Sequence, residues 1–442
     1  MREMKDSGIE WVGAIPVEWK CNSIRNLMIS RDGGAWGSEP ENESEGTICL
    51  RIADFDYTKG RFKKCKMEQL TRRQYTAAQI KKLMLKKGDI LVEKSGGGEK
   101  IPVGRAVYYD GEYGDVLYAN FMERLRFNCL YVNPIWMTYW LRSWYECKGS
   151  PYYINQTTGI QNINLSLMLA KEKAYYPDLV LQEKIIEFLD AKCAEIDALT
   201  ADIQTQIDTL EQYKRSIITE AVTRGLNPDV EMKDSGTPWC PLIPIHWKYA
   251  NPKALFTQRL DRAYPGDKQL TASQEYGVIY QDEYMELTGT KIVTVMKDFS
   301  ILKHVEPNDF VISMRSFQGG LEYSERRGSI SSAYVMLIPN NEYVYPPFYR
   351  WFFKSSKYIN AIQSTSNLVR DGQAMRYANF AQVPLFIIPL DEQKQISEYL
   401  DEKVRKIDEI LKSKNNQLEI LAEYKKSLIY EYVTGKKEVP AI

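Results

Sequence analysis

Two stretches of the chain, residues 189–223 and 400–434, place an apolar residue at nearly every seventh position and mostly polar residues between. A narrow apolar stripe with a period near 3.5 residues is typical of a coiled-coil seam, so each stretch is predicted to be a long helix. Lys414 interrupts the second stripe, and a charge there weakens the seam but can fix its register. The predicted seam consists of Leu189, Ile196, Ile203, Leu210 and Ile217 in the first helix and of Leu400, Ile407, Leu421 and Leu428 in the second.

Each helix is expected to extend for about forty residues, which is roughly 60 Å at 1.5 Å per residue. Gly225 and Pro228 are expected to end the first helix, and Gly435 and Pro440 the second. An alternative interpretation makes both stretches amphipathic core helices of larger domains, although their charged surfaces favour the seam. Further apolar residues beside the seam are expected to support it: Leu199, Ile207, Tyr213, Ile410, Leu411, Leu418 and Tyr424.

The two predicted helices also resemble each other, because fourteen of their thirty-five positions are identical at an offset of 211 residues. A repeated motif precedes each helix. "MKDSGIEWVGAIPVEWK" at 4–20 and "MKDSGTPWCPLIPIHWK" at 232–248 share ten of seventeen residues. The order of motif, longer segment and helix therefore occurs twice, and the chain is expected to fold as two like halves.

The longer segments between motif and helix show only faint similarity, as between "KKGDILVEKSG" (86–96) and "EPNDFVISMRS" (306–316). We therefore expect two divergent domains separated by two long antiparallel coiled-coil helices, in a pseudo-twofold circular repeat. In chain order the expected parts are an N-terminal joint segment (1–20), a first domain (21–178), a central long helix (179–227), a repeated joint segment (228–248), a second domain (249–389) and a C-terminal long helix (390–442).

Like halves tend to pack about a pseudo-twofold axis, which would place the two domains at opposite ends of a rod. Duplex DNA has a local dyad too, and about 60 Å of rod is close to two turns of roughly 34 Å each. Because the domains differ, such a protein would read a bipartite, asymmetric DNA site with a gap set by the helices. The second motif is expected to pack near Ala221 and Gly225. By symmetry Trp11 should lie beside Tyr432 and Gly435, so that the two ends of the chain meet.

Composition restricts the function less than the repeat does. The chain has 58 basic and 58 acidic residues, so any nucleic-acid site must be a local patch. Its seven cysteines form no CxxC pair, which argues against a zinc site or disulfide framework and for the reducing cytoplasm. Residues 1–20 lack the apolar run of a signal peptide, and no run of about 18 apolar residues predicts a membrane span.

The strongest electrostatic signal is residues 61–87, which contain ten Lys or Arg and one Glu. Such a run would neutralise phosphates, although a solvated surface segment has the same composition. Arg and Gln at loop tips suit the reading of guanine and adenine edges, but any one of them can instead bind phosphate or simply be exposed. The candidate DNA-binding residues are Lys63, Lys64, Arg72, Arg73, Lys94, Ser95, Lys100, Arg105, Gln161 and Asn162 in the first domain and Arg315, Gln318, Arg326, Arg327, Arg370, Gln373 and Arg376 in the second.

The sequence contains no recognisable pattern of catalytic residues. "GGGEK" (96–100) lacks the spacing of a phosphate-binding loop, and His246 and His304 have no triad or metal-ligand spacing around them. "YPPF" (345–348) has Tyr345 where the similar loop of amino-methyltransferases needs Asp or Asn. The chain is therefore expected to be non-catalytic, with no metal or cofactor of its own.

Taken over its whole length, the sequence resembles the specificity subunit of type I restriction-modification systems. The resemblance is carried by the repeated motif, by "GDILV" (88–92), by "YKRSIITEAVTRGL" (213–226), by "LDEQKQISEYLDEKVRKIDEI" (390–410) and by the circular repeat. It implies that the divergent segments are α/β target recognition domains and that the helices are conserved spacers. It identifies no DNA-binding residues, because the recognition domains are the divergent part of the family.

The resemblance also implies partners. Two modification subunits would methylate adenine with S-adenosylmethionine, and restriction subunits would cleave DNA with ATP and Mg²⁺, so these cofactors would belong to the partners. Two alternatives remain open. The chain could be a non-catalytic coiled-coil scaffold with two protein-binding domains, or a nuclease or methyltransferase whose site the sequence does not reveal.

Overall fold

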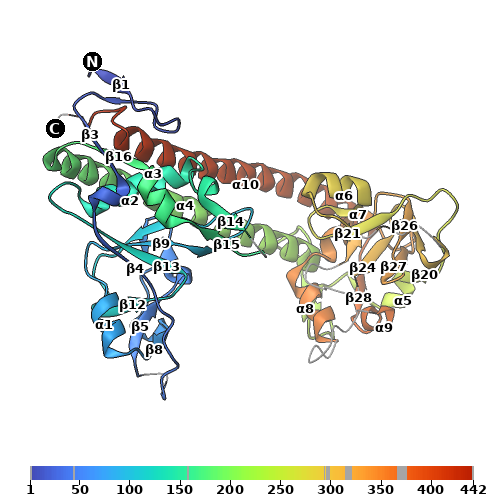
Figure 1. Ribbon diagram of the computed structural model, residues 1–442. Coiled ribbons are helices and arrows are strands. Elements are labelled where there is room, and N and C mark those ends of the chain that lie inside the picture. The colour runs from blue at the N-terminus through green and yellow to red at the C-terminus, as the bar shows by residue number, and fades with distance from the viewer. Residues whose placement is uncertain are drawn as a thin grey trace. The chain divides into compact units, whose positions relative to one another are not determined.

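The computed structural model describes residues 2–42, 45–156, 159–292, 294, 299–313, 321–365 and 376–440. The chain forms two compact units. Unit 1 comprises Met1–Ile203 and Asn416–Ile442, and unit 2 comprises Gln204–Asn415. Each unit therefore contains one joint segment, one divergent segment and a part of both long helices, as the chain colouring of Figure 1 makes clear.

Both predicted long helices are present, as α4 (Leu179–Arg224) with 46 residues and α10 (Leu390–Val433) with 44 residues. Gly225 and Gly435 follow their last turns with φ angles of +77° and +70°. Glycine adopts this left-handed conformation without strain, and it is a common way for helices to end. The glycines thus end the two helices where the sequence predicted.

The two helices run antiparallel within each unit. In unit 1 the Asp197 carboxylate of α4 binds Lys425 of α10 at 2.6 Å. In the same unit an earlier residue of α4 meets a later one of α10, since the rings of Phe188 and Tyr432 lie 4.6 Å apart. In unit 2 Lys214 binds Asp408 at 2.5 Å, and Gly225 lies against Glu392.

The predicted seam is largely buried. Seven of its nine positions are at most 8% exposed, and Leu210 and Leu421 are half-buried. The expectation that the flanking residues all support the seam is wrong for four of them, because a two-helix seam is too narrow to cover side chains on both of its sides. These four are 46–54% exposed: Leu199, Tyr213, Ile410 and Tyr424.

The core of unit 1 is a four-stranded antiparallel sheet, with one aromatic helix against it. The helix α2 (Pro134–Glu146) buries Trp136, Trp140 and Trp144, and each indole is at most 1% exposed. The sheet contains, in spatial order, β11 (Ala106–Tyr108), β9 (Ile90–Glu93), β13 (Met122–Phe127) and β4 (Met28–Gly33). A smaller sheet contains β12 (Val116–Tyr118), β5 (Thr47–Leu50) and β8 (Arg72–Arg73), and further elements are α1 (Ala77–Leu83) and α3 (Leu165–Lys171).

Unit 2 repeats the topology of the four-stranded sheet, although its sequence hardly repeats that of unit 1. In both units the first strand of the sheet in chain order pairs with the last one. The last strand also pairs with the strand that follows an aspartate turn, and that strand pairs with the remaining strand of the sheet. The unit 2 sheet contains β20 (Phe256–Arg259), β27 (Tyr334–Pro339), β24 (Phe310–Ser313) and β25 (Glu322–Tyr323). Its helices are α5 (Pro252–Leu255), α6 (Gln281–Thr288), α7 (Pro346–Phe352), α8 (Ser356–Ser364) and α9 (Tyr377–Phe380).

Short strand pairs connect these sheets to the helices and the joint segments. Two of these pairs recur in both units: β1–β2 and β3–β16 in unit 1 correspond to β17–β18 and β19–β28 in unit 2. The repeat therefore includes connections as well as cores. In unit 1 they are β3 (Lys20–Ser23) with β16 (Lys173–Tyr176), β1 (Met4–Asp6) with β2 (Ala14–Pro16), and β6 (Phe55–Asp56) with β7 (Arg61–Phe62). In unit 2 they are β19 (Lys248–Ala250) with β28 (Leu385–Ile387), β17 (Met232–Asp234) with β18 (Leu242–Pro244), β21 (Leu270–Ser273) with β22 (Gly277–Tyr280), and β23 (Lys303–Val305) with β26 (Gly328–Ile330).

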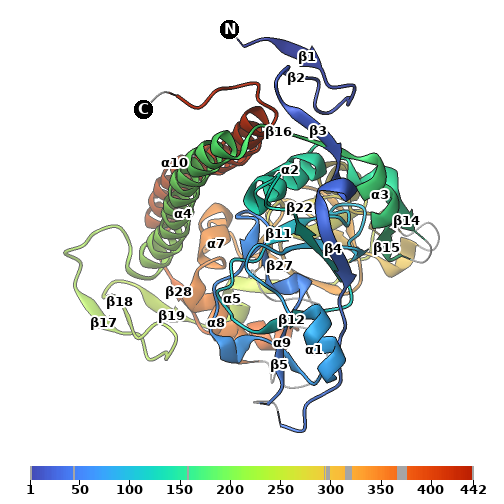
Figure 2. The same cartoon turned by 60° about the vertical axis from the view of Figure 1, so that its left-hand side comes forward.

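The two ends of the chain meet in unit 1, as predicted (Figure 2). Tyr430 of α10 donates a hydrogen bond of 2.9 Å to the carbonyl oxygen of Trp11, and Lys436 donates one to the carbonyl of Val12. Trp19, in the same motif, is 2% exposed and packs against the C-terminal turn at Gly435. The N-terminal motif is therefore a structural joint on the end of α10.

The second motif forms the corresponding joint in unit 2. Trp247 is fully buried with Ala221 of α4, and its indole Nε1 donates a hydrogen bond of 3.0 Å to Glu392 of α10. Ile243 belongs to the same core. The motif occurs twice because each pair of helix ends is covered by one copy of it.

Candidate nucleic-acid interface

One buried aspartate fixes the turn before the central strand in each unit. Asp89 and Asp309 are each 1% exposed and occupy equivalent positions of the two faintly similar segments. Asp89 binds the guanidinium of Arg126 through both carboxylate oxygens, at 2.6 and 2.7 Å. Asp309 binds Arg259 in the same two-pronged way, at 2.6 and 3.0 Å. Such paired charge-assisted hydrogen bonds fix both groups, so the strands that follow leave the turn in a defined direction.

The pKa directions agree with this burial. Loss of water raises the pKa of Asp309, although hydrogen bonds from Arg259 and the Glu306 backbone oppose the rise. The hydrogen bond to Asp89 raises the pKa of Arg126. Neither pair is apparent from the sequence, because the arginine comes from β13 in unit 1 and from β20 in unit 2 and so leaves no repeated pattern.

Beyond β9, the chain enters a small three-stranded antiparallel sheet that holds several predicted DNA-binding residues. Its strands are β10 (Ser95–Gly96), β15 (Gln161–Ile163) and β14 (Ile154–Gln156). Ser95 lies opposite Asn162, and its hydroxyl donates a hydrogen bond of 2.5 Å to Asn162 Oδ1. Asn162 is exposed, Lys94 is half-buried, and Lys100 is exposed in the loop after β10. The structure thus brings Lys94, Ser95, Lys100 and Asn162 to one small sheet.

Two other predicted residues near this sheet are engaged inside the protein. The guanidinium of Arg105 binds the buried Glu93 at 2.7 and 2.9 Å and lies 3.5 Å from the ring centroid of Tyr57. Burial lowers the pKa of Arg105, but the hydrogen bond and charge of Glu93 outweigh it and raise the pKa. Gln161 is 6% exposed and accepts a hydrogen bond from the Val103 backbone. This placement favours a structural role for Arg105 and Gln161.

The basic run 61–87 does not form one continuous surface. It is divided among β7, a short 3₁₀ helix at Met67–Gln69, β8 and α1. Phe62, which stands between basic residues in this run, is buried in the hydrophobic core of unit 1. In Figure 1 β8 and α1 lie at the end of unit 1 that is remote from α4 and α10.

The four candidates from this run differ in their surroundings. Lys63 donates a hydrogen bond of 2.7 Å to the Ala53 carbonyl, and Arg72 donates one of 2.9 Å to that of Gly46. Arg73 binds Glu39 at 3.0 Å and lies 4.2 Å from the Trp36 ring. Lys64 is exposed and makes no hydrogen bond or ion pair within the described part of the chain. Lys64 is therefore the candidate of this run with the freest charge.

In unit 2 the described candidates are Arg326, Arg327 and Arg376. Arg326 binds Glu283 at 3.0 Å and stacks on Tyr280. Arg327 is exposed, with Glu306 at 3.5 Å, and Arg376 is exposed at the start of α9. The remaining candidates lie outside the described residues: Arg315, Gln318, Arg370 and Gln373.

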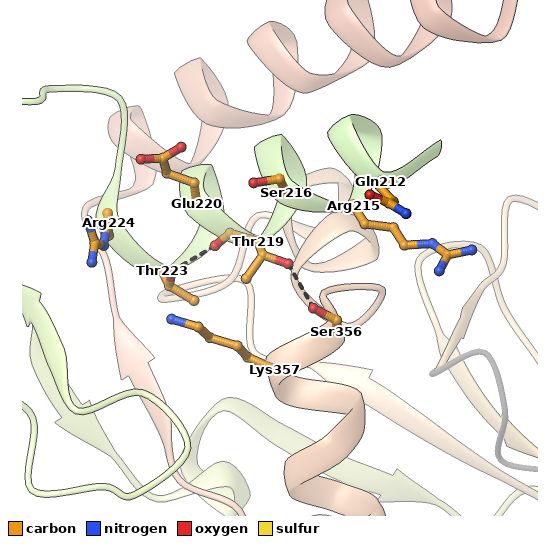
Figure 3. Close-up of a pocket in the computed structure, with 9 residues that line it drawn as sticks. All are labelled: Gln212, Arg215, Ser216, Thr219, Glu220, Thr223, Arg224, Ser356 and Lys357. Carbon is orange, nitrogen blue, oxygen red and sulfur yellow. Dashed lines mark hydrogen bonds between the residues drawn. The ribbon is translucent and has the colours of Figure 1, made fainter. Parts of the chain in front are cut away.

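Two hollows border the long helices at places related by the repeat. The unit 2 hollow, of about 500 Å³, is lined by Gln212, Arg215 and Ser216 of α4, with Lys357 of α8 opposite (Figure 3). The offset of 211 residues maps these three positions onto Glu423, Lys426 and Ser427 of α10, which line the unit 1 hollow of about 480 Å³. The two hollows differ in chemistry, because apolar side chains line much of the one in unit 1.

A buried lysine connects the unit 1 domain to the helix pair at this hollow. Lys425 is 8% exposed, binds Asp197 at 2.6 Å and donates a hydrogen bond of 2.8 Å to the Thr58 carbonyl. A buried ammonium needs such partners, because burial without them is costly. The sequence pattern gave no sign of it, since a lysine beside an apolar seam normally reaches water.

No helix in the described part of the chain has the length and apolar character of a membrane span. The same part contains no cluster of three His, Cys, Asp or Glu residues placed to hold a metal ion.

Comparison with known proteins agrees with the resemblance seen in the sequence. No family model matches the chain. The chain is 22% identical over 441 residues to a putative type I restriction enzyme MjaX specificity subunit of Methanocaldococcus jannaschii, covering 97% of this chain and 96% of that protein. This full-length similarity confirms the resemblance to type I specificity subunits.

Two solved structures share the fold. One comes from work on complex assembly and conformational transition of the type I R-M system, with 12% identity, a TM-score of 0.68 and coverage of 96% of this chain and 99% of that one. The other is the HsdS subunit from Thermoanaerobacter tengcongensis, with 12% identity, a TM-score of 0.50 and coverage of 96% and 98%. The predicted fold class, mixed α and β with paired long helices, is thereby confirmed.

Proposed function

We propose that the chain is the DNA sequence-specificity subunit of a type I restriction-modification complex. Each unit reads one half of a bipartite, asymmetric DNA site, and the paired helices set the gap between the halves. Partner subunits carry out the chemistry: two modification subunits methylate adenine, and restriction subunits cleave. The chain itself is a non-catalytic, cytoplasmic protein that binds no cofactor, and S-adenosylmethionine, ATP and Mg²⁺ belong to the partners.

One observation carries this proposal: the two units share the topology of their main sheet, but they expose different side chains. Both units form the same four-stranded sheet with a buried aspartate–arginine pair, and in both the sheet shares a hydrophobic core with parts of α4 and α10. The side chains they expose differ, as between Asn162 with Lys100 in unit 1 and Arg327 with Arg376 in unit 2. Duplex DNA has local twofold symmetry, so two domains of equal topology can bind it in equivalent orientations. Different exposed side chains then allow each domain to read a different sequence.

The exposed side chains suit DNA better than a second protein. Lysines that form no hydrogen bond or ion pair with the described residues, such as Lys64 and Lys100, are the groups that bind phosphate. Exposed amides such as that of Asn162 read base edges. The scaffold alternative offers no reason for amides and cations to gather on the domains, while the apolar hollow of unit 1 lies beside the long helices instead.

Salt-dependent binding tests the proposal. The chain, in complex with its modification subunits, is expected to bind its target duplex in an electrophoretic shift assay and to lose about 10³-fold or more in affinity between 50 and 200 mM salt. A scrambled duplex of the same length is the matched control and should bind more weakly by about 10³-fold. A complex that binds both duplexes equally well would contradict the proposal and favour the scaffold.

A further inference from the structure

The sheet β10–β15–β14 carries an ordered polar row on one face. Ser95 of β10 lies opposite Asn162 of β15, and Asn162 lies opposite Asn155 of β14. Side chains at directly opposed positions point to the same face, about 5 Å apart between neighbouring strands. Asn155 and Asn162 are both exposed, so this face of the sheet is open.

The opposite face of the same strands is closed. The neighbouring residues Gln161 and Ile163 of β15 are 6% and 7% exposed, and Ile154 of β14 is half-buried. Alternation along a strand therefore fixes which residues can meet a ligand. No sequence pattern distinguishes Asn155, since only the strand register places it in line with Ser95 and Asn162.

The amides of this row keep free hydrogen-bonding groups. The Ser95 hydroxyl occupies one acceptor position of Asn162 Oδ1, which fixes the amide plane and leaves its NH₂ group to donate outward. The Asn155 side chain has no hydrogen-bond partner among the described residues. Each of the two exposed amides, the fixed one of Asn162 and the unpartnered one of Asn155, offers a donor and an acceptor side by side, the pattern that an adenine edge complements through N6 and N7.

We infer that this row reads base edges in the major groove, with Asn155 and Asn162 as specificity-determining residues for the half-site bound by unit 1. The inference rests on the proposed function and deepens it. Two strands fit the major groove, which is about 12 Å wide, and Figure 2 shows the β14–β15 hairpin at the margin of unit 1 beside α3. Two amides about 5 Å apart reach neighbouring base pairs, which are stacked about 3.4 Å apart.

The charges around the row fit phosphates on either side of a groove. Lys94 precedes Ser95 directly, and Lys100 is exposed in the loop that leaves β10. Two acidic residues border this stretch of the chain: Glu93, which is buried and bound by Arg105, and Glu99 in the loop that holds Lys100. Lys94 and Lys100 position the duplex without reading it, so specificity in this region depends on the amides.

Single substitutions in the complete complex test the inference. The target is first identified from the adenines methylated in cells that carry the chain and its partners. Competition binding is then measured with duplexes in which each base pair of one half-site is changed in turn. Asn155→Ala and Asn162→Ala are each expected to reduce discrimination at an A·T pair of the unit 1 half-site by about 10-fold or more, because each removes a bidentate base contact. Discrimination in the other half-site should not change.

Matched controls separate this inference from the proposed function. Asn416→Ala removes another exposed amide, from α10, and should leave both half-sites unaltered. If an alanine variant loses discrimination at both half-sites, Asn155→Asp and Asn162→Asp are tested, because they keep the side-chain shape. A carboxylate accepts a hydrogen bond from the amino group of cytosine, so these variants should shift the preference from adenine towards cytosine. Unchanged discrimination of the unit 1 half-site in all four variants would overturn the inference. A wild-type complex without any sequence preference would instead overturn the proposed function.

Discussion

Replacement of Trp19 by alanine is expected to destabilise unit 1 by about 3–5 kcal/mol. Trp19 is 2% exposed, lies edge-on against Trp136 with ring centroids 5.5 Å apart, and contacts the turn that ends α10. The truncation opens a cavity where the two ends of the chain meet, so both the domain and the helix end lose packing. For a unit of this size the midpoint of thermal unfolding should fall by about 10 °C.

Trp36→Ala is the matched control for Trp19→Ala. Trp36 is 39% exposed and contacts Arg73 through its ring face, an interaction that contributes about 0.5–1 kcal/mol at exposed sites. Calorimetry of the two variants should therefore show a large shift for Trp19 and a small one for Trp36. Equal shifts would contradict the role of the N-terminal motif as a joint.

A pair of glycines gives an independent check of the same joint. Gly435 and Gly8 have φ angles of +70° and +68°, so alanine costs backbone strain at both. Only at Gly435 would the added methyl group collide, since it would lie 2.6 Å from Pro16. Gly435→Ala should thus destabilise the protein clearly more than Gly8→Ala.

Insertion of three heptads into each long helix is expected to widen the gap in the recognised DNA site by about nine to ten base pairs. Twenty-one residues lengthen a helix by about 32 Å at 1.5 Å per residue, which is close to one turn of duplex DNA. Because whole heptads preserve the seam, the helices stay paired. The insertion points are after Ile203 in α4 and after Asn415 in α10, where the chain divides into its two units.

The methylation pattern of cells carrying the lengthened chain measures this change. Both half-sites should keep their sequences, because the insertion touches neither domain. Insertion into α4 alone is the control, and it should reduce methylation sharply since the two helices can no longer pair along their whole length. Altered half-sites, or an unaltered gap, would contradict the role of the helices as spacers.

Features that repeat along the chain could be predicted from the sequence. The seven-residue period located α4 and α10 and most of their buried positions, because a period of apolar residues reports directly on a packed surface. The duplicated motif predicted that Trp11 meets the end of α10, since two copies imply two equivalent surroundings. Both predictions rest on comparison of the chain with itself.

Features that depend on partners far apart in the chain could not be predicted in this way. Arg105 and Gln161 are of residue types that often read DNA bases, but Arg105 is bound to Glu93 and Gln161 is hydrogen-bonded to the Val103 backbone. Lys425 would be expected in solvent, and it is buried because Asp197 and the Thr58 carbonyl surround it. In each case the deciding partner is contributed by a different element, so only the fold reveals it.

The central claim is that each unit reads one half of a bipartite DNA site, and a domain exchange tests it most directly. Residues 21–178 are replaced by the corresponding segment of a related chain, and methylated adenines are mapped across the genome of cells that also carry the modification subunits. The account predicts that one half-site changes completely while the other half-site and the gap stay the same. A change in both half-sites, or in neither, would contradict it.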